Sequence, residues 1–139
     1  MDRELFLSVF REHLGKCRTL DAAVLVAGDI SSRSYLIANG LPEAFRPEDL
    51  AAIGAVGDVL GRFLDAAGND VPHPLAERTV GVELCVLQAI PEKILAAAGP
   101  HKVRIIRAAA RRGLVDTLIT DDVTAELLIR DPEGEVFSG

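Results

Sequence analysis

The sequence predicts an α/β domain with a mainly parallel sheet flanked by helices. Three short apolar runs, at 21–29, 93–99 and 115–120, end in or are followed by glycine or aspartate, which is typical of buried parallel strands. Each run is followed by a segment that favours a helix, and alternating strands and helices indicate a parallel sheet. The 139 residues fit a single domain, and an apolar content of 49% is sufficient for a core.

An amphipathic helix is expected over residues 2–14, before the α/β core at 21–130. Leu5 and Val9 share one face of this helix, with Phe6 and Phe10 beside them. The remaining elements are expected as a strand over 21–29, a loop over 30–42, a short helix within 46–54, a strand over 58–65, a turn over 66–70, a helix within 80–91, a strand over 93–99, a helix over 101–113, a strand over 115–120, a helix over 121–130 and a frayed tail over 131–139.

Composition argues against several classes of function. A formal net charge of −6 opposes nucleic-acid binding by this chain, because phosphate neutralisation requires clustered lysine and arginine. Cys17 and Cys85 form no CxxC motif, which favours a reduced, cytoplasmic setting. No apolar run is long enough to span a membrane. His13 and His73 have no partner at metal-ligand spacing, and no catalytic triad is recognisable, so neither a metal site nor a cofactor is expected.

Polar residues at the carboxyl ends of the predicted strands are candidates for a ligand site, because parallel sheets bind ligands at that edge. Four groups qualify: Gly28 with Asp29, Gly99 with His101 and Lys102, Thr120 with Asp121 and Asp122, and the cluster Gly54, Gly57, Asp58, Gly61 and Arg62.

Lys102 is the strongest single candidate. It lies in the first turn of the predicted helix at 101–113, where a cation is unfavourable for the helix and an anion such as phosphate would compensate. The alternative is a solvated surface lysine. Asp121 is either a helix cap or a carboxylate that accepts hydrogen bonds from a polyol hydroxyl.

The glycine cluster also permits two interpretations. The "GAVGD" segment is either a turn whose N–H groups bind an anion or a place where two backbones approach closely. If 58–65 is one strand, Asp58 and Arg62 share a face, and a buried ion pair between them is the structural alternative to a ligand site.

The chain resembles the sugar-binding domain of the SorC family of bacterial transcriptional regulators over roughly residues 21–129. The segments that carry the resemblance appear in the family's order: "GAVGDVLGRFLDAAG" at 54–68, Pro74 and Leu75 with Arg78 and Gly81, Ile90 with Pro91, the segment 98–102 ending in Lys102, the segment "GLVDTLITD" at 113–121, and Thr124 with Ala125.

The resemblance implies a Rossmann-like sheet related to phosphosugar isomerases and CoA transferases, and an effector-binding function without catalysis. Lys102 would contact the phosphate of a sugar phosphate, and Arg62 and Asp58 would line the sugar pocket. Gly57, Gly99 and Asp121 are assigned to the same ligand site. A homo-oligomer is implied, with no membrane contact, and DNA would be reached only through an attached helix-turn-helix.

The chain departs from the family pattern in four respects. No helix-turn-helix is recognisable, and the first half of the family domain, with its glycine-rich phosphate loop, has no counterpart, so a partial domain is expected. Either Pro100 replaces the second glycine of the family's phosphate segment or the spacing of that segment has shifted, and Pro100 removes an N–H group. "VAGD" replaces a more glycine-rich segment after the first strand.

Two other functions remain open at this point. One is a phosphosugar isomerase-like enzyme that uses Asp58 or Asp121 as a base. The other is an oligomerisation module without a ligand, in which the helix over 2–14 makes the contact.

Overall fold

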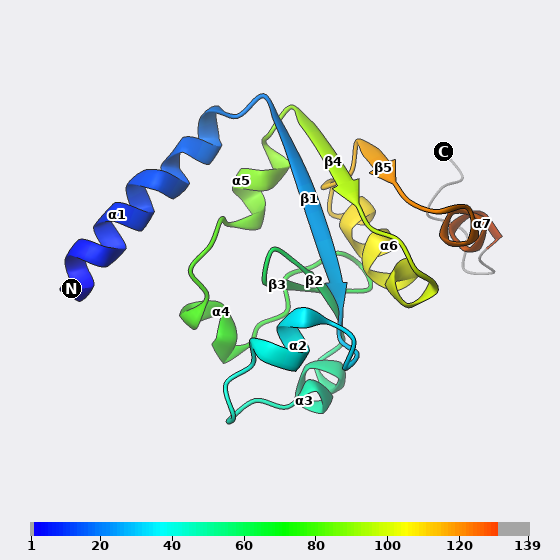
Figure 1. The fold of residues 1–139 in the computed structure, drawn as a ribbon, viewed down its shortest axis with the longest axis horizontal. Helices are drawn as coiled ribbons and strands as arrows, with labels where there is room; N and C mark the ends of the chain where they lie inside the picture. The colour runs from blue at the N-terminus through cyan, green and yellow to red at the C-terminus, as the bar shows by residue number, and fades with distance from the viewer. Residues whose placement is uncertain (1, 131–139) are drawn as a thin grey trace.

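A five-stranded sheet forms the centre of the computed structural model, which describes residues 2–130 (Figure 1). In chain order, the strands are β1 (Ala22–Asp29), β2 (Ala55–Val59), β3 (Arg62–Asp65), β4 (Glu92–Ala96) and β5 (Thr117–Ile119). Their order in the sheet is β3-β2-β1-β4-β5. Strands β1, β4 and β5 are parallel, whereas β2 is antiparallel to both β1 and β3. The predicted α/β class is confirmed, and the sheet has an antiparallel half that the sequence does not reveal.

The helices lie mainly around one face of the parallel half and around the antiparallel half (Figure 1). They are α1 (Arg3–Gly15), the 3₁₀-helix η1 (Lys16–Thr19), α2 (Tyr35–Asn39), α3 (Pro47–Ala52), α4 (Pro74–Arg78), α5 (Leu84–Gln88), the 3₁₀-helix η2 (Pro100–Lys102), α6 (Val103–Arg111) and α7 (Asp122–Arg130). The positions predicted for most helices are confirmed, and α2 forms inside a segment expected to be a loop.

Two apolar clusters form the core. In the larger one, Leu25 of β1 and Leu95 of β4 pack with Ile105 and Ile106 of α6, and all four are fully buried. The smaller cluster joins the antiparallel half to its helices through residues such as Leu50 of α3. Because aromatic residues are scarce, aliphatic side chains account for nearly all of this packing.

The segment 58–65 is a β-hairpin and not a single strand, which corrects the prediction. Leu60 and Gly61 form its two-residue turn, with φ angles of 50° and 81°. Asp58 pairs with Phe63, and Val59 pairs with Arg62. Since directly paired residues share a face and successive residues alternate, Asp58 and Arg62 point to opposite faces of the hairpin. The proposed Asp58–Arg62 pair therefore does not form.

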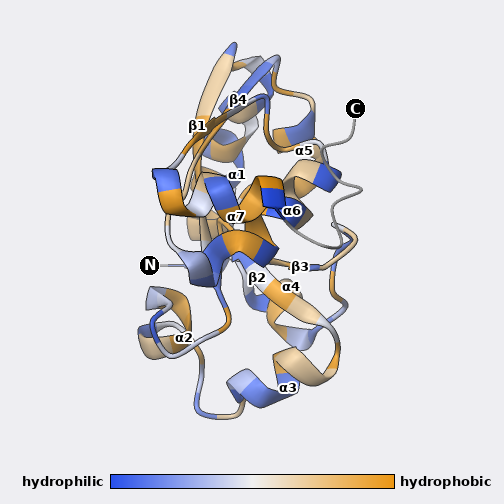
Figure 2. Cartoon of the chain, turned by 90° about the vertical axis from the view of Figure 1, so that its right-hand side faces the viewer, coloured by the Kyte–Doolittle hydropathy of each residue, from blue (hydrophilic) through white to orange (hydrophobic). Residues whose placement is uncertain are grey.

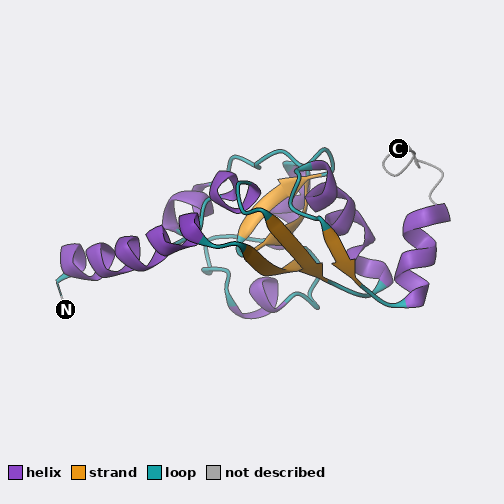
Figure 3. Cartoon of the chain, turned by 90° about the horizontal axis from the view of Figure 1, so that it is seen from above, coloured by secondary structure: helices purple, strands orange, loops and turns teal. Residues whose placement is uncertain are grey.

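Helix α1 confirms the helix predicted over 2–14, but it contributes no buried residue. Asp2 caps its first turn by accepting a hydrogen bond from the N–H of Glu4 at 3.2 Å. The helix extends away from the sheet at one end of the molecule, while α7 lies at the other end (Figure 3). Its apolar side chains Leu5 and Val9 are 59% and 57% exposed.

One face of the parallel half is also exposed, although its strands were expected to be buried. Leu25 of β1 is buried, whereas Val24 and Val26 on the opposite face are 67% and 56% exposed. Ile119 of the edge strand β5 is similarly exposed. Figure 2 shows hydrophobic colouring along β1. Among the described residues, helices therefore cover this part of the sheet on one side only.

Two further expectations concern the tail of the chain and membrane-spanning helices. The tail predicted over 131–139 lies outside the described residues. Within residues 2–130, no helix combines the length and the apolar character needed to cross a bilayer.

Candidate functional site

A pocket of about 430 Å³ lies where β1 ends, between β2 and the start of α6. We call it the strand-end pocket. Its walls come from four places: the end of β1 with the loop that follows, the start of α2, the hairpin, and η2. The residues that line it are Val26, Ala27, Gly28, Asp29, Arg33, Ser34, Tyr35, Leu36, Asp58, Leu60, His101 and Lys102. It corresponds to the edge of a parallel sheet at which ligands bind in α/β folds.

Two buried acids, Asp29 and Asp58, line the strand-end pocket. Asp29 is the last residue of β1, and it pairs with Gly57 across the β1–β2 ladder. Asp58 is the next residue of β2 and pairs with Gly28. Their exposed fractions are 6% and 7%, so both acids have been largely removed from water. Buried carboxylates need hydrogen-bond donors, which a polyhydroxylated ligand supplies.

Gly28 leaves the space that the Asp58 carboxylate occupies. A Cβ atom at Gly28 would lie 2.7 Å from Oδ1 of Asp58 and 3.1 Å from Oγ of Ser34. Any side chain at position 28 would therefore displace both polar groups from the pocket wall. The "VAGD" segment after the first strand thus has a structural reason for its glycine.

Burial raises the pKa of Asp58 above its ordinary value of 3.8. The N–H of Gly61 donates a hydrogen bond to Oδ2 of Asp58 at 2.8 Å, and this bond, together with the charge of Lys102, partly opposes the increase in pKa. The charge of Asp29 raises the pKa of Asp58 further. The ionisation of Asp58 is therefore coupled to the charges of Asp29 and Lys102.

Lys102, His101 and Arg33 also line the strand-end pocket. Lys102 ends η2 and directly precedes α6, as the sequence predicts, and it is half-buried in the strand-end pocket. Gly99, with φ of 117°, allows the tight turn before η2, and the N–H of Lys102 closes that turn on the carbonyl of Gly99 at 2.9 Å. The site thus brings acidic and basic residues together in one pocket, and the charge of Lys102 acts on the carboxyl of Asp58.

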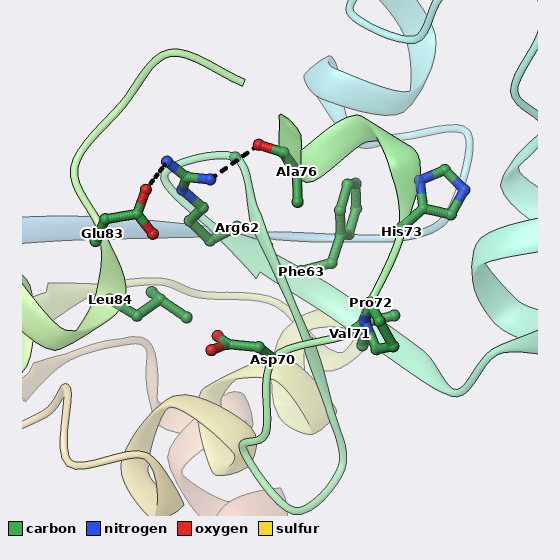
Figure 4. Close-up of a pocket in the computed structure, with 10 residues that line it drawn as sticks. Arg62, Phe63, Asp70, Val71, Pro72, His73, Ala76, Glu83 and Leu84 are labelled. Atoms are coloured by element: carbon green, nitrogen blue, oxygen red, sulfur yellow. Dashed lines mark hydrogen bonds and ion pairs between the residues drawn. The ribbon is translucent and has the colours of Figure 1, made fainter. Parts of the chain in front are cut away.

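Arg62 lies in a different pocket, of about 200 Å³, which it lines together with Asp70, His73 and Glu83 (Figure 4). Its guanidinium donates to the carboxylate of Glu83 at 2.8 Å. It also donates to three backbone carbonyl groups at 3.2–3.4 Å, those of Ala76, Gly81 and Val82.

The contacts of Arg62 hold the segment between α4 and α5 against the hairpin. Its side chain is only 11% exposed, and these contacts engage several of its donors. The expectation that Arg62 and Lys102 line the same pocket is therefore not met.

The other candidate residues occupy positions with evident structural causes. Gly57 is buried, and a Cβ atom there would lie 2.3 Å from the carbonyl oxygen of Gly28 and 2.7 Å from Ile105. The N–H of Gly99 donates to the hydroxyl of Thr124 at 2.8 Å. Asp121 accepts from the N–H of Thr124 at 2.6 Å, a hydrogen bond that lowers the pKa of its carboxyl. None of the three lines the strand-end pocket.

Sequence reasoning placed Gly28, Asp29, Asp58, His101 and Lys102 near a ligand site but passed over the loop after β1. That loop contributes Arg33 and the buried hydroxyl of Ser34 to the pocket. The sequence contains a signal for it, because "SSRS" follows directly after a strand end. Within residues 2–130, no group of three potential metal ligands comes together.

Comparison with known proteins identifies the class of this fold and site. A family model described as "Putative sugar-binding domain" matches residues 6–130. The erythritol catabolism regulatory protein EryD of Brucella abortus is 34% identical over 120 residues, which are 86% of this chain and 37% of EryD.

Solved structures show the same relationship. A transcriptional regulator from Streptococcus pneumoniae superimposes with a TM-score of 0.76 at 33% identity, over 85% of this chain and 45% of that one. The full-length sorbitol operon regulator SorC from Klebsiella pneumoniae also gives a TM-score of 0.76, at 27% identity, over 87% of this chain and 39% of SorC.

The fold and its matches define a regulatory sugar-binding domain. The chain belongs to the sugar-binding domain family of SorC-type transcriptional regulators. These relatives are transcriptional regulators and not enzymes, which favours ligand binding over the isomerase alternative. The chain spans between one third and one half of the length of the relatives described here.

Proposed function

We propose that the strand-end pocket binds a phosphorylated sugar or polyol as the effector of a transcriptional regulator. The observation that carries this proposal is the presence, in one pocket, of two buried carboxylates and the half-buried Lys102. Asp29 and Asp58 would accept hydrogen bonds from hydroxyl groups, and Lys102 would neutralise a phosphate. DNA would be engaged by a separate helix-turn-helix of the regulator.

The position of Lys102 supports a phosphate ligand. It directly precedes α6, so the positive end of the helix dipole and the ammonium group would act on the same anion. Pro100 has no backbone N–H group to donate to an anion, so side chains would make more of the contacts to the phosphate. His101, beside Lys102 in η2, and Arg33, in the loop after β1, line the same pocket and would add to this binding.

The names of two relatives support a polyhydroxylated ligand. EryD is named for erythritol catabolism and SorC for the sorbitol operon, and both compounds are polyols. Polyols present only hydroxyl groups, which donate to carboxylates such as those of Asp29 and Asp58. We infer the ligand class from this chemistry and leave the individual sugar to experiment.

Thermal unfolding with a panel of phosphorylated sugars and polyols tests the proposal. A ligand at 100 times its Kd stabilises the folded chain by about 2.7 kcal/mol, which raises Tm by several degrees. We expect such a shift for at least one phosphorylated compound and a smaller shift for its unphosphorylated counterpart. Lys102→Ala should remove the shift, whereas Lys16→Ala, a change at an exposed lysine far from the pocket in sequence, should retain it.

Two results would contradict the proposal. One is the absence of any shift across the panel. The other is an equal shift in the wild type and in Lys102→Ala, which would place the ligand elsewhere. Inorganic phosphate alone serves as the probe for nonspecific anion binding.

A further inference from the structure

The hydroxyl group of Ser34 has no hydrogen-bond partner within residues 2–130, although the residue is buried. Ser34 is 7% exposed and lines the strand-end pocket. It is the N-cap residue of α2, where a serine usually accepts a hydrogen bond from the first turn of its helix, yet its side chain makes no such bond. A buried polar group without a partner is costly, so a partner from outside the described residues would stabilise it.

Asp58 places a second unpaired oxygen atom near this hydroxyl group. Oδ2 of Asp58 accepts the hydrogen bond from the N–H of Gly61 at 2.8 Å, whereas Oδ1 has no donor among residues 2–130. A Cβ atom on Gly28 would lie 2.7 Å from Oδ1 of Asp58 and 3.1 Å from Oγ of Ser34, so both oxygen atoms lie around one point. We call the space at this point, which Gly28, Ser34 and Asp58 border, the Gly28 notch.

The strand ladder and the start of α2 fix the positions of these two oxygen atoms. Gly28 of β1 pairs directly with Asp58 of β2, so the two residues share a face of the sheet. The N–H of Ser34 donates to the carbonyl of Ser31 at 3.0 Å, and buried Ile37 anchors α2 in the smaller apolar cluster. The Gly28 notch is therefore formed before anything binds, which reduces the ordering cost of binding.

A hydroxyl group has the hydrogen-bonding properties that the Gly28 notch requires. It donates one proton, which Oδ1 of Asp58 accepts, and its lone pairs accept from the O–H of Ser34. A phosphate oxygen only accepts, and the carboxylate of Asp58 would repel it. A carbon atom without a hydroxyl group would leave both oxygen atoms of the notch unpaired.

We propose that the Gly28 notch selects one free hydroxyl group of the effector, with Ser34 as its donor and Asp58 as its acceptor. This inference rests on the proposed function and narrows the ligand class to phosphorylated sugars or polyols that carry an unmodified hydroxyl group at the carbon nearest Gly28. Ser34 is then a specificity-determining residue. A deoxy compound lacks the hydroxyl group, and an O-methyl compound lacks its proton and adds a carbon where space is short.

Calorimetric titration with erythritol 4-phosphate, sorbitol 6-phosphate, ribose 5-phosphate, glucose 6-phosphate and the monodeoxy derivatives of each tests the proposal. For a parent compound that binds, Ser34→Ala should raise Kd about three- to tenfold, the effect of one hydrogen bond. One monodeoxy derivative should bind the wild type at least about tenfold more weakly than its parent, because both oxygen atoms of the notch stay unpaired. For that derivative alone, Ser34→Ala should not raise Kd.

Two further variants and one stability measurement separate binding from folding. Ser32→Ala, at an exposed serine of the same loop that does not line the pocket, should leave every Kd unchanged. Gly28→Ala puts a carbon atom into the notch and should weaken the parent compound at least as much as Ser34→Ala does. Because Ser34→Ala breaks no hydrogen bond within residues 2–130, Tm of the free variant should stay within about 2 °C of the wild type.

Four outcomes would overturn the proposal. Binding that Lys102→Ala removes but Ser34→Ala leaves unchanged would retain the proposed function and leave the notch to water. An equal rise in Kd for the parent and for every monodeoxy derivative would mean that Ser34 acts indirectly. A fall in Tm of several degrees in free Ser34→Ala would assign the hydroxyl group a structural role. Absence of binding by every compound to the wild type would contradict this inference and the proposed function together.

Discussion

At the scale of single residues, the strand-end pocket depends on Asp58, a carboxylate that folding removes from water. Desolvation is the main reason that its pKa is raised, and the nearby charge of Asp29 acts in the same direction. The hydrogen bond from Gly61 and the charge of Lys102 reduce the effect without cancelling it. A phosphorylated ligand would therefore enter a pocket in which one acid holds its proton more tightly than an exposed aspartate does.

The raised pKa of Asp58 predicts a pH dependence of stability. Above pH 3.8 and below the folded-state pKa, the folded chain binds more protons than the unfolded chain, so stability falls as pH rises through this window. The Asp58→Asn variant lacks this carboxyl group, so its stability does not fall for this reason as pH rises. Urea unfolding between pH 3.5 and 8 should show the variant gaining stability relative to the wild type as pH rises, until a plateau. Glu77→Gln is the exposed control, and a difference independent of pH would refute the prediction.

At the scale of secondary-structure elements, the hairpin turn carries backbone strain. Leu60 is the only non-glycine residue within 2–130 with a positive φ. A β-carbon in this left-handed region costs about 1–2 kcal/mol, and asparagine tolerates the conformation better than leucine. The hairpin retains leucine here although Asn-Gly is the preferred sequence for such turns.

Replacing Leu60 with asparagine should therefore stabilise the chain. Urea unfolding of Leu60→Asn should give an unfolding free energy about 1 kcal/mol higher than that of the wild type. Leu60→Ala serves as the matched control, because alanine removes the side chain but keeps the strain. Equal stability of the two variants would show that the turn geometry is not the cause.

The hairpin also shows why sequence predicts the α/β core better than the antiparallel half. The runs at β1, β4 and β5 are bounded by clear signals, and their order and parallel pairing follow from general rules. The segment 58–65 has the composition of a strand, and its "LG" turn lacks the usual asparagine or aspartate, so it resembles one strand. Once that strand is divided, Arg62 moves to the other face, away from Asp58.

Candidate residues were predictable to the extent that local chain geometry determines their position. Lys102 was placed correctly at the start of a helix because the glycine and the helix are neighbours in sequence. The hydrogen-bond partners of Arg62 lie 14–21 residues further along the chain. No local sequence pattern indicates that this segment packs against the hairpin. Long-range hydrogen bonds of this kind depend on tertiary structure alone.

At the scale of the whole molecule, a few arginines join the parallel half to the antiparallel half. Arg112 follows α6 and donates to Gln88 of α5 at 3.1 Å, to the carbonyl of Gly68 at 3.2 Å and to Asp70 at 3.3 Å. Its side chain is 20% exposed, so these contacts lie partly out of water. One residue thus connects three segments that are far apart in sequence.

Removing this connection should lower global stability. Arg112→Ala should reduce the unfolding free energy by about 1–3 kcal/mol, because it deletes three hydrogen bonds, one of them to a carboxylate. Arg104→Ala, at an exposed position in α6, should change the unfolding free energy by less than about 0.5 kcal/mol. Equal effects in guanidinium unfolding would show that the connection contributes nothing.

Val26 lines the strand-end pocket and also belongs to the exposed face of the parallel half of the sheet. A molecule bound in the pocket would therefore reach the edge of that apolar surface. Thermodynamic reciprocity then requires that any second molecule which binds this face changes the affinity of the pocket by the same factor by which pocket occupancy changes its own affinity.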